Sequence, residues 1–303
     1  MVIMNVSVII VNYNTKELTK NCLASIFEKT KNIDFEVIVS DNGSTDGSIE
    51  MIKSDFPQVV LIENNANLGF GKANNIAAKI AKGKYLLFLN SDTILLNNAI
   101  KEFFDKAEIE KESVILGSYL CDSEEKICNS YGSFMNPFIF IIKKNVYDFY
   151  PKILQWRLSN LQNKKYAKIS LKEKKVDFIT GADLFIKKED FYKIKGFDEN
   201  FFMYFEDEDL CRTAKKNEIQ CKIIMSPQIK HLEGASSSVK IRKLLIQDDS
   251  FFYYCKKWNS IAKAKQIKYF FKIAFPIRLF SNTFSKNEKQ EMKMHTRQMI
   301  NKC

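Results

Sequence analysis

Four hydrophobic segments in the N-terminal third of the chain alternate with stretches of helical periodicity. The segments are residues 6–11, 35–40, 59–62 and 85–89. The first is a continuous run of mainly β-branched residues, which is typical of a strand buried on both faces of a parallel sheet. After it, Leu18, Cys22 and Ile26 recur on one face of a helix. The alternation predicts a doubly wound, mostly parallel, Rossmann-like α/β sheet.

Polar clusters follow these segments at the points where the predicted strands end. Asp41 begins one cluster, Asn67 lies in the next, and Asp92 follows the fourth strand. Because the carboxyl ends of parallel strands meet at one edge of a sheet, where open α/β sheets bind ligands, we expect these side chains to gather in one crevice. One Asp-Asn-Gly turn is usually only a turn, but three such clusters at one edge indicate a binding site.

Composition limits the core and the class of partner. The 303 residues are 46% hydrophobic, enough for one large core or two modest ones. The formal net charge of +11 favours an anionic partner, which leaves nucleic acid, acidic lipid headgroups and phosphorylated small molecules open. Seven cysteines without a Cys-x-x-Cys pair indicate reduced thiols in a cytosolic protein. We expect no signal peptide, and residues 138–142, the longest apolar run, are too few to span a bilayer.

Two regions are expected from the patterning. Residues 1–236 are predicted to form the α/β domain, with a variable insertion at about 118–175. Residues 237–303 are predicted to be a helical extension, in which basic residues surround aromatic and aliphatic ones. This pattern suits an amphipathic appendage that touches an anionic membrane. A helix pair packed on the α/β core with a solvated basic face would show the same pattern, so both interpretations stay open.

An aromatic run leads directly into four consecutive acids within residues 201–210. Adjacent carboxylates repel one another and each is costly to desolvate, so packing does not explain them. One interpretation is a solvated turn at a helix start, where the helix dipole favours negative charge. The other is that the aromatic wall partly dries one carboxylate and tunes it as a general base.

Eight short motifs follow one another between residues 6 and 236. They are VNYN at 11–14, DNGSTDG at 41–47, NLGFGKANN at 67–75, LNSDT at 89–93, TGA at 180–182, GFDE at 196–199, EDEDL at 206–210, and His231 with Gly234 and Ser236. The ordered set resembles family 2 inverting glycosyltransferases of the GT-A fold, and within them the bacterial rhamnosyltransferase-like branch. The resemblance implies the GT-A fold, here with a basic helical extension at the C-terminus.

The resemblance also implies a nucleotide-diphosphate sugar as the donor. It places Asp41 against the base, with Tyr13 and the backbone near Val11 lining the same pocket, and Asn67 and Asn74 at the base and ribose. For Asp41 the alternative is an Asx turn that only shapes the backbone. The remaining donor-binding residues that it implies are Asn90, Ser91, Asp92, Gly181 and Ala182. The last two would form a floor under the donor sugar, where small residues let the backbone approach a ligand.

A divalent metal ion is implied in the same way. The family's Asp-x-Asp motif corresponds to residues 90–92, where Asn90 replaces the first acid, as in the Asn-Ser-Asp form of this branch. Asp92 and His231 would then bind Mn²⁺ or Mg²⁺, which bridges the diphosphate. A purely structural histidine is the alternative for His231.

The resemblance assigns the acids of the aromatic run to different roles. The family's Glu-Asp pair corresponds to Glu206 and Asp207, with Asp207 as the general base that deprotonates the acceptor hydroxyl. Glu206 is expected to face the acceptor or to support the base. Asp209 is expected to be the N-cap of the following helix.

The predicted function is inverting transfer of a sugar to a hydroxyl of a cell-surface glycan or lipid-linked saccharide. The branch favours dTDP-rhamnose as donor and leaves UDP-sugars open, and we expect a peripheral protein at the cytoplasmic face of the membrane. A sugar-phosphate nucleotidyltransferase would carry a Gly-rich, Arg-containing loop after the first strand, and a processive synthase would carry membrane helices. A non-enzymatic nucleic-acid binder would explain the net charge but not the acids at the strand ends, so nucleic acid is not an expected partner.

Overall fold

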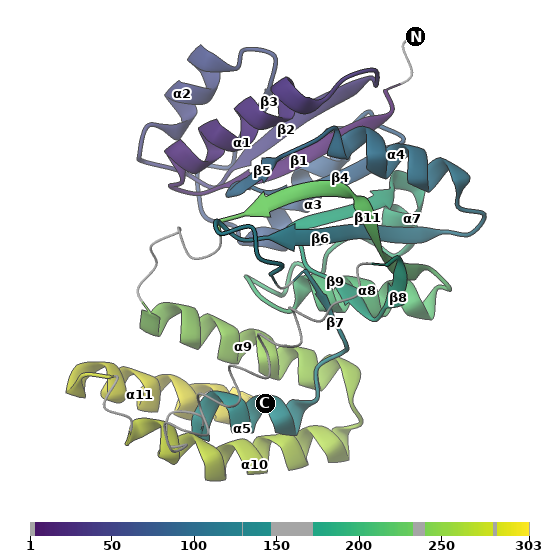
Figure 1. Cartoon of the computed structure of the whole chain (residues 1–303). Coiled ribbons are helices and arrows are strands. Elements are labelled where there is room, and N and C mark those ends of the chain that lie inside the picture. The colour runs from purple at the N-terminus through teal and green to yellow at the C-terminus, as the bar shows by residue number, and fades with distance from the viewer. Residues whose placement is uncertain (1–3, 129, 147–171, 233–239, 281–283, 303) are drawn as a thin grey trace. The chain divides into compact units, whose positions relative to one another are not determined.

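The computed structural model describes residues 4–128, 130–146, 172–232, 240–280 and 284–302. These residues pack into two compact units (Figure 1). The first unit contains the sheet with α1 to α4, α7 and α8. The second contains α5, α9, α10 and α11, together with the segment Met203–Phe205. The region of α5, which the sequence placed in an insertion of the first domain, therefore groups with the C-terminal helices. The predicted boundary at 236 lies outside the described residues.

The first unit is an α/β unit. Its strands are β1 (Val6–Asn12), β2 (Phe35–Asp41), β3 (Val60–Glu63), β4 (Tyr85–Asn90), β5 (Thr93–Leu95), β6 (Val114–Cys121), β7 (Tyr131–Gly132), β8 (Lys174–Val176), β9 (Phe178–Ile179), β10 (Asp183–Lys187) and β11 (Gln220–His231). Its helices are α1 (Lys16–Lys29), α2 (Ser48–Asp55), α3 (Phe70–Ile80), α4 (Ala99–Ile109), α7 (Lys188–Lys193) and α8 (Glu206–Lys216). The four predicted strands near the N-terminus are β1 to β4.

A nine-stranded sheet forms the centre of the first unit. Its order is β3-β2-β1-β4-β10-β6-β11-β5, with β8 also paired to β11. The strands β1 to β4 are parallel, as predicted, whereas β10 runs antiparallel between β4 and β6. The start of β10 therefore lies at the edge where β1, β2 and β4 end, because Asp183 pairs with Leu89. This is the edge at which open α/β sheets bind ligands.

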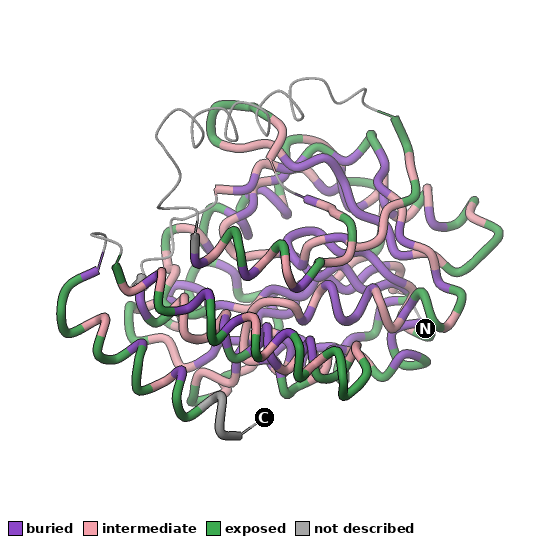
Figure 2. Tube along the Cα trace, turned by 90° about the horizontal axis from the view of Figure 1, so that it is seen from below, coloured by how far each residue is buried: buried purple, intermediate pink, exposed green. Residues whose placement is uncertain are grey.

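The core of the first unit lies against both faces of the sheet. Val6, Val8, Ile9 and Ile10 of β1 are all fully buried, which explains the unbroken β-branched run in the sequence. Helix α1 contributes Cys22, Leu23 and Ile26 to the same core, as the helical spacing predicted. In Figure 2 buried and exposed stretches alternate along the helices, as expected for amphipathic helices packed on a core.

Strand β11 continues beyond the point where the sequence predicted it to end. The apolar pattern of residues 221–225, followed by proline, predicts a strand that stops at Pro227, but β11 runs to His231. Its register with β6 shifts between Ile224 and Ile229. Proline cannot donate a backbone hydrogen bond, and an irregularity of this kind accommodates it within a strand. The prediction was wrong because a register shift between strands cannot be seen in the local pattern of one strand.

The second unit is helical. It consists of α5 (Pro137–Val146), α9 (Lys240–Trp258), α10 (Ile261–Leu279) and α11 (Lys286–Lys302), in which α10 packs on α5 and α9, and α11 packs on α9. Its core contains Phe251, Phe252 and Phe271, all nearly or fully buried. Phe205 packs into the same core, with ring centroids 5.4 Å from those of Phe140 and Tyr254.

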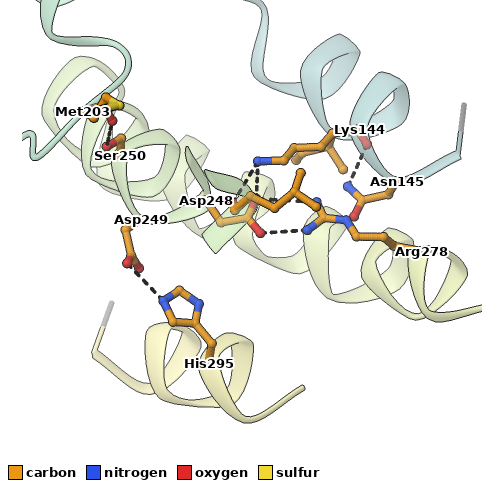
Figure 3. A network of polar contacts seen from close by, with 10 residues as sticks. Lys144, Asn145, Met203, Asp248, Asp249, Ser250, Arg278 and His295 are labelled. Atoms are coloured by element: carbon orange, nitrogen blue, oxygen red, sulfur yellow. Dashed lines mark hydrogen bonds and ion pairs between the residues drawn. The ribbon is translucent and has the colours of Figure 1, made fainter. Parts of the chain in front are cut away.

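Three buried charges join the helices of the second unit (Figure 3). Asp248 of α9 accepts hydrogen bonds from Arg278 of α10 and pairs with Lys144 of α5 at 2.9 Å. All three side chains are at most 8% exposed. Burial lowers the pKa of Lys144 to about 8, although the charge of Asp248 acts in the opposite direction. The network holds two cations for one carboxylate, so the charge of Lys144 is only partly compensated.

The pKa of Lys144 predicts a pH dependence of stability. Because the folded-state pKa of about 8 lies below the value of 10.5 expected for the unfolded chain, unfolding takes up a proton between these pH values. The contribution of Lys144 to the free energy of unfolding therefore rises by about 1 kcal/mol per pH unit in that window. Chemical denaturation from pH 7 to 9.5 should show this rise in the wild type relative to Lys144→Met. If the free energies of unfolding of the two proteins change equally with pH, this prediction is contradicted.

Candidate active site

Asp92 and His231 meet at the carboxyl edge of the sheet. The antiparallel pairing of β5 with β11 places His231 opposite Thr93, and the backbone N–H of Leu232 donates to the Asp92 carbonyl at 2.9 Å. As a result, His231 Nε2 lies 3.1 Å from Asp92 Oδ1 and 3.3 Å from Asn90 Nδ2. The two residues are 139 positions apart in the sequence, and the tertiary structure brings them together. Gly234 and Ser236, which belong to the same motif, lie outside the described residues.

These side chains are donors of the kinds that a divalent cation accepts. Within the described residues, no three His, Cys, Asp or Glu side chains form a cluster that could hold a metal ion. Asp92 and His231 nevertheless supply one carboxylate oxygen and one imidazole nitrogen that lie 3.1 Å apart. Mn²⁺ accepts both kinds of ligand. Ions bound with substrate phosphates commonly take few protein ligands and complete their coordination with phosphate oxygens and water.

Gly181 and Ala182 connect the end of β4, beside Asp92 and His231, to the candidate base Asp207. The Ala182 carbonyl accepts a hydrogen bond from the Asn90 backbone N–H at 3.1 Å. The neighbouring Gly181 N–H donates to Asp207 Oδ2, also at 3.1 Å. A Cβ atom at Gly181 would lie 2.9 Å from the Phe70 ring, so only glycine fits without a shift of that ring. One short turn before β10 therefore fixes both the end of β4 and the carboxylate of Asp207.

Glu206 and Asp207 form an acidic pair at the start of α8, in which Glu206 is buried and Asp207 is half-buried. Asp207 Oδ1 accepts the Glu208 N–H at 2.8 Å, which orients its carboxylate at the helix N-terminus. Burial raises the pKa of Asp207 above its ordinary value, although the N–H groups of Glu208 and Gly181 act in the opposite direction. Burial, and after it the charge of Asp207, raises the pKa of Glu206 well above its ordinary value. The two N–H groups that donate to Asp207 favour its anion, and the charge of Asp207 in turn favours the protonated form of Glu206.

Asp209 does not cap the helix. Helix α8 starts at Glu206, so Asp209 lies inside its first turn, and it is 2% exposed. The preceding residues Tyr204 and Phe205 have left-handed φ values of 71° and 69°, which turn the chain sharply just before the helix. The sequence prediction was wrong because neither residue type signals such a turn.

Asp41 is the centre of its turn. Its side chain is fully buried. Oδ1 accepts the backbone N–H groups of Gly43 and Ser44, and Oδ2 accepts from Asn12 Nδ2 and the Ser44 hydroxyl at 2.6 Å each. These four bonds fill the acceptor sites of a carboxylate. The structure thus shows the Asx turn that the sequence left as an alternative. A direct contact of Asp41 with a base stays a prediction that requires one of these bonds to be exchanged.

The other predicted donor-binding residues surround the same strand ends. Val11 pairs with Ser40 and Asn90 across β1, and the Tyr13 side chain is 43% exposed, so its ring is accessible to a ligand. The Ser91 hydroxyl lies 3.1 Å from that of Thr15. These residues therefore lie together at the carboxyl end of β1.

The side chains of Asn67 and Asn74 form hydrogen bonds with the backbone of the protein. Asn67 Oδ1 accepts the Gly69 N–H at 3.1 Å, which closes the loop before α3. Asn74 is 1% exposed and donates to the Phe70 carbonyl within α3. Asn67 lies at the edge of the site, whereas Asn74 serves its own helix in this conformation.

Gly69 is required by the close approach of two backbone segments. Its φ is +85°, and a Cβ atom there would lie 2.3 Å from the Phe202 carbonyl oxygen. Gly47 has a similar φ of +81°, but its Cβ would meet only the Lys16 side-chain end at 3.4 Å. We expect Gly47→Ala to cost about 1–2 kcal/mol of unfolding free energy from backbone strain. Gly69→Ala should cost about 1–3 kcal/mol more, because its ψ of 176° lies in a region almost restricted to glycine and because of the clash. Urea denaturation of both variants measures the difference, and equal losses would refute the role of the Phe202 contact.

Two polar residues of the site were not predicted. Asn12 bonds to Asp41 and Ser44 through Nδ2 and accepts from Thr15 and Thr19 through Oδ1, so it ties β1 to the neighbouring turn and helix. Its position at a strand end was the available signal. Asp183 follows Ala182, is fully buried, and accepts both the N–H and the hydroxyl of Ser118 at 2.6 Å. Burial raises the pKa of Asp183 to about 7.

Asp183 had no sequence signal. It begins β10, whose other residues are mostly apolar and typical of a core strand, and its partner Ser118 is 65 residues away.

Two curated relatives show what the chain is similar to. It is 26% identical over 214 residues to the N-acetylglucosaminyl-diphospho-decaprenol L-rhamnosyltransferase of Mycobacterium tuberculosis, which covers 67% of this chain and 68% of that protein. It is 38% identical over 128 residues to the UDP-Glc:alpha-D-GlcNAc-diphosphoundecaprenol beta-1,3-glucosyltransferase WfaP of Escherichia coli, which covers 38% of this chain and 50% of that protein. The matches to four curated relatives span between 19% and 50% of their lengths.

A solved structure and a family model complete the comparison. The crystal structure of S. aureus TarS matches 94% of this chain and 44% of that protein, with a TM-score of 0.53. At 18% sequence identity this match shows similarity of the fold alone. The model of the family described as Glycosyl transferase family 2 matches residues 7–193. This match includes Asp92 and Gly181 but ends before Asp207 and His231. Because it covers more than half of the chain, this protein, whose fold is GT-A, belongs to glycosyl transferase family 2.

Proposed function

We propose that the protein is an inverting glycosyltransferase that moves a sugar from a nucleotide-diphosphate donor to a hydroxyl of a lipid-linked or cell-surface saccharide. The observation that carries the proposal is the hydrogen-bonded connection from Asp207 through Gly181 and Ala182 to Asn90, beside the Asp92–His231 pair. In the proposal, this connection links the base to a metal ion on the phosphate side through a turn of small residues.

Each part of the site would serve one step of the transfer. Tyr13 would pack against the base, while the turn held by Asp41 would shape the pocket for the nucleoside. Asp92 and His231 would hold a divalent ion, which when bound supplies positive charge to the departing diphosphate oxygens. Asp207 would accept the proton of the acceptor hydroxyl as its oxygen bonds to the anomeric carbon and the bond to the diphosphate breaks on the opposite face.

Glu206 would support the base. Its buried Oε2 has no hydrogen-bond partner among the residues that the structure describes. A neutral Glu206 carboxyl next to Asp207 avoids two adjacent negative charges in one buried site. In this arrangement a proton on Glu206 keeps Asp207 free to ionise.

The names of the relatives narrow the proposal for donor and acceptor. One of them is an L-rhamnosyltransferase and another uses UDP-Glc, and both names contain a saccharide on a polyprenyl diphosphate. We propose dTDP-rhamnose as the preferred donor, with a UDP-sugar as the alternative, and a lipid-diphosphate saccharide as the acceptor. The protein would then work at the cytoplasmic membrane face. Among the described residues, no helix is long and apolar enough to cross a membrane.

The test is a transfer assay with a panel of donors. Purified protein is incubated with Mn²⁺, a polyprenyl-diphosphate saccharide, and either dTDP-rhamnose, UDP-glucose or UDP-N-acetylglucosamine, and the product is identified by mass spectrometry. We expect one added deoxyhexose from dTDP-rhamnose, and no product when the metal is chelated. Transfer from a UDP-sugar alone would replace the proposed donor. Failure of every donor to react or bind would refute the proposed function.

A further inference from the structure

Helix α10 is apolar on two opposite faces. One face is buried, since Ile267, Phe271 and Phe275 belong to the core of the second unit. The other face is exposed: Tyr269 is 68%, Ile273 55% and Phe280, the residue after the helix, 75% accessible. A soluble surface helix normally has one apolar face. Among the residues that the structure describes, the second apolar face of α10 therefore has no partner.

The exposed apolar residues form one stripe. At 100° per residue, Tyr269, Ile273 and Phe280 fall within about 40° of one another around the helix axis. Ala262 and Pro276 lie on the same side and are also exposed. These five residues are called the outer stripe of α10. A contiguous apolar stripe of this kind marks an interaction surface, unlike isolated exposed side chains.

Basic residues flank the outer stripe. Lys265, Lys268 and Lys272 lie along one side of it, and the helix contains no acidic residue. Lysine can extend its ammonium group beyond an apolar surface while its aliphatic stem remains on it. An apolar stripe beside a row of lysines is complementary to a surface with a hydrocarbon interior and a negatively charged boundary.

We propose that the outer stripe of α10 docks the protein on a bilayer that contains anionic phospholipids. This deepens the proposed function, on which it rests for the lipid-linked acceptor, and it assigns the membrane contact to one face of one helix. Tyr269, Ile273 and Phe280 enter the region between headgroups and acyl chains, and the lysines pair with lipid phosphates. The alternative partner for this apolar face is a second copy of the chain. In such a dimer the lysine row would face lysines of the other copy, and this repulsion disfavours it.

The sedimentation test separates the apolar and the electrostatic contributions. Full-length protein is centrifuged with vesicles of phosphatidylglycerol and phosphatidylcholine, and with vesicles of phosphatidylcholine alone. We expect binding to the anionic vesicles that weakens with salt, and at least tenfold weaker binding to the neutral ones. Lys265→Gln/Lys268→Gln/Lys272→Gln should lose about fivefold in affinity per lysine. Ile273→Ser/Phe280→Ser should lose binding at least as strongly.

Matched controls lie on the first unit. Ile80→Ser/Ile109→Ser removes two apolar side chains that are 47% and 71% exposed. Lys31→Gln/Lys79→Gln/Lys111→Gln removes the same charge from exposed positions. We expect the apolar control to bind vesicles like the wild type, and the lysine control to lose less than twofold. If the lysine control loses as much vesicle affinity as the α10 lysine variant, binding depends on net charge alone, and the proposal is overturned. The proposal is overturned equally if the apolar control loses as much affinity as Ile273→Ser/Phe280→Ser.

Two further measurements make the outcome decisive. Light scattering of the wild type should show a monomer, and a dimer that Ile273→Ser/Phe280→Ser dissociates would overturn the proposal in favour of self-association. Nucleotide-sugar binding, measured in solution without lipid, should be unchanged in the α10 variants. If vesicles bind but no donor does, the proposed function fails while the docking surface stands. If donors bind but vesicles do not, the docking surface fails alone.

Discussion

Asp207→Asn is expected to lower kcat by about 10²–10⁴-fold, the range for loss of a general base. Asparagine keeps the size of the side chain and one acceptor oxygen for the Gly181 or Glu208 N–H, so the local fold should be retained. It cannot take up a proton at neutral pH. Donor binding should therefore change little, and the loss should be in turnover. Single-turnover transfer, together with calorimetric donor binding, separates the two quantities.

The pH profile gives an independent readout of the same assignment. Asp207 must be ionised to act, so wild-type kcat should fall as pH drops through the pKa of Asp207. Since burial raises that pKa above the ordinary value, the fall should begin at a higher pH than for an exposed aspartate. The residual activity of Asp207→Asn should lack this acidic limb.

Two control variants make the base assignment falsifiable. Glu199→Gln changes an acid in an exposed loop of the same unit and should leave kcat within about twofold. Glu206→Gln mimics the protonated form that burial favours, so it should cost less than about tenfold. A larger loss for Glu206→Gln than for Asp207→Asn would exchange the roles of the two residues.

The second large effect is expected at the proposed metal site. Asp92→Asn and His231→Ala should each reduce kcat/KM by about 100-fold or more at fixed Mn²⁺, because each removes a proposed ligand. Both should also weaken the Mn²⁺-dependent binding of a nucleoside diphosphate, which calorimetry measures without turnover. Raising the Mn²⁺ concentration should recover part of the loss in both variants.

The chain supplies its own control for the histidine. His295, its only other histidine, lies in α11 of the second unit and bonds to Asp249 at 3.0 Å. His295→Ala should leave the Mn²⁺ dependence unchanged, and a small loss of stability is its only expected effect. Full Mn²⁺ stimulation in His231→Ala would support the structural alternative for His231.

Much of the fold followed from local patterns. The β-branched run of β1 and the apolar spacing of α1 depend on neighbouring residues only, so they predicted the parallel part of the sheet. The parallel order of β1, β2 and β4 brings their carboxyl ends to one edge, where Asn12 pairs with Asp41 and Val11 pairs with Asn90. The roles of Asp207, Asp92 and His231 in catalysis remain predictions.

The geometry of the site depended on contacts that the local patterns do not encode. The extension of β11 past Pro227, and its pairing with β5, bring His231 to Asp92. The antiparallel insertion of β10 brings Gly181 to Asp207. These are pairings between segments up to 139 residues apart, and they form because the sheet as a whole buries its apolar faces. Short-range periodicity therefore identified the strands, whereas burial and strand pairing across the whole sheet chose which side chains would meet.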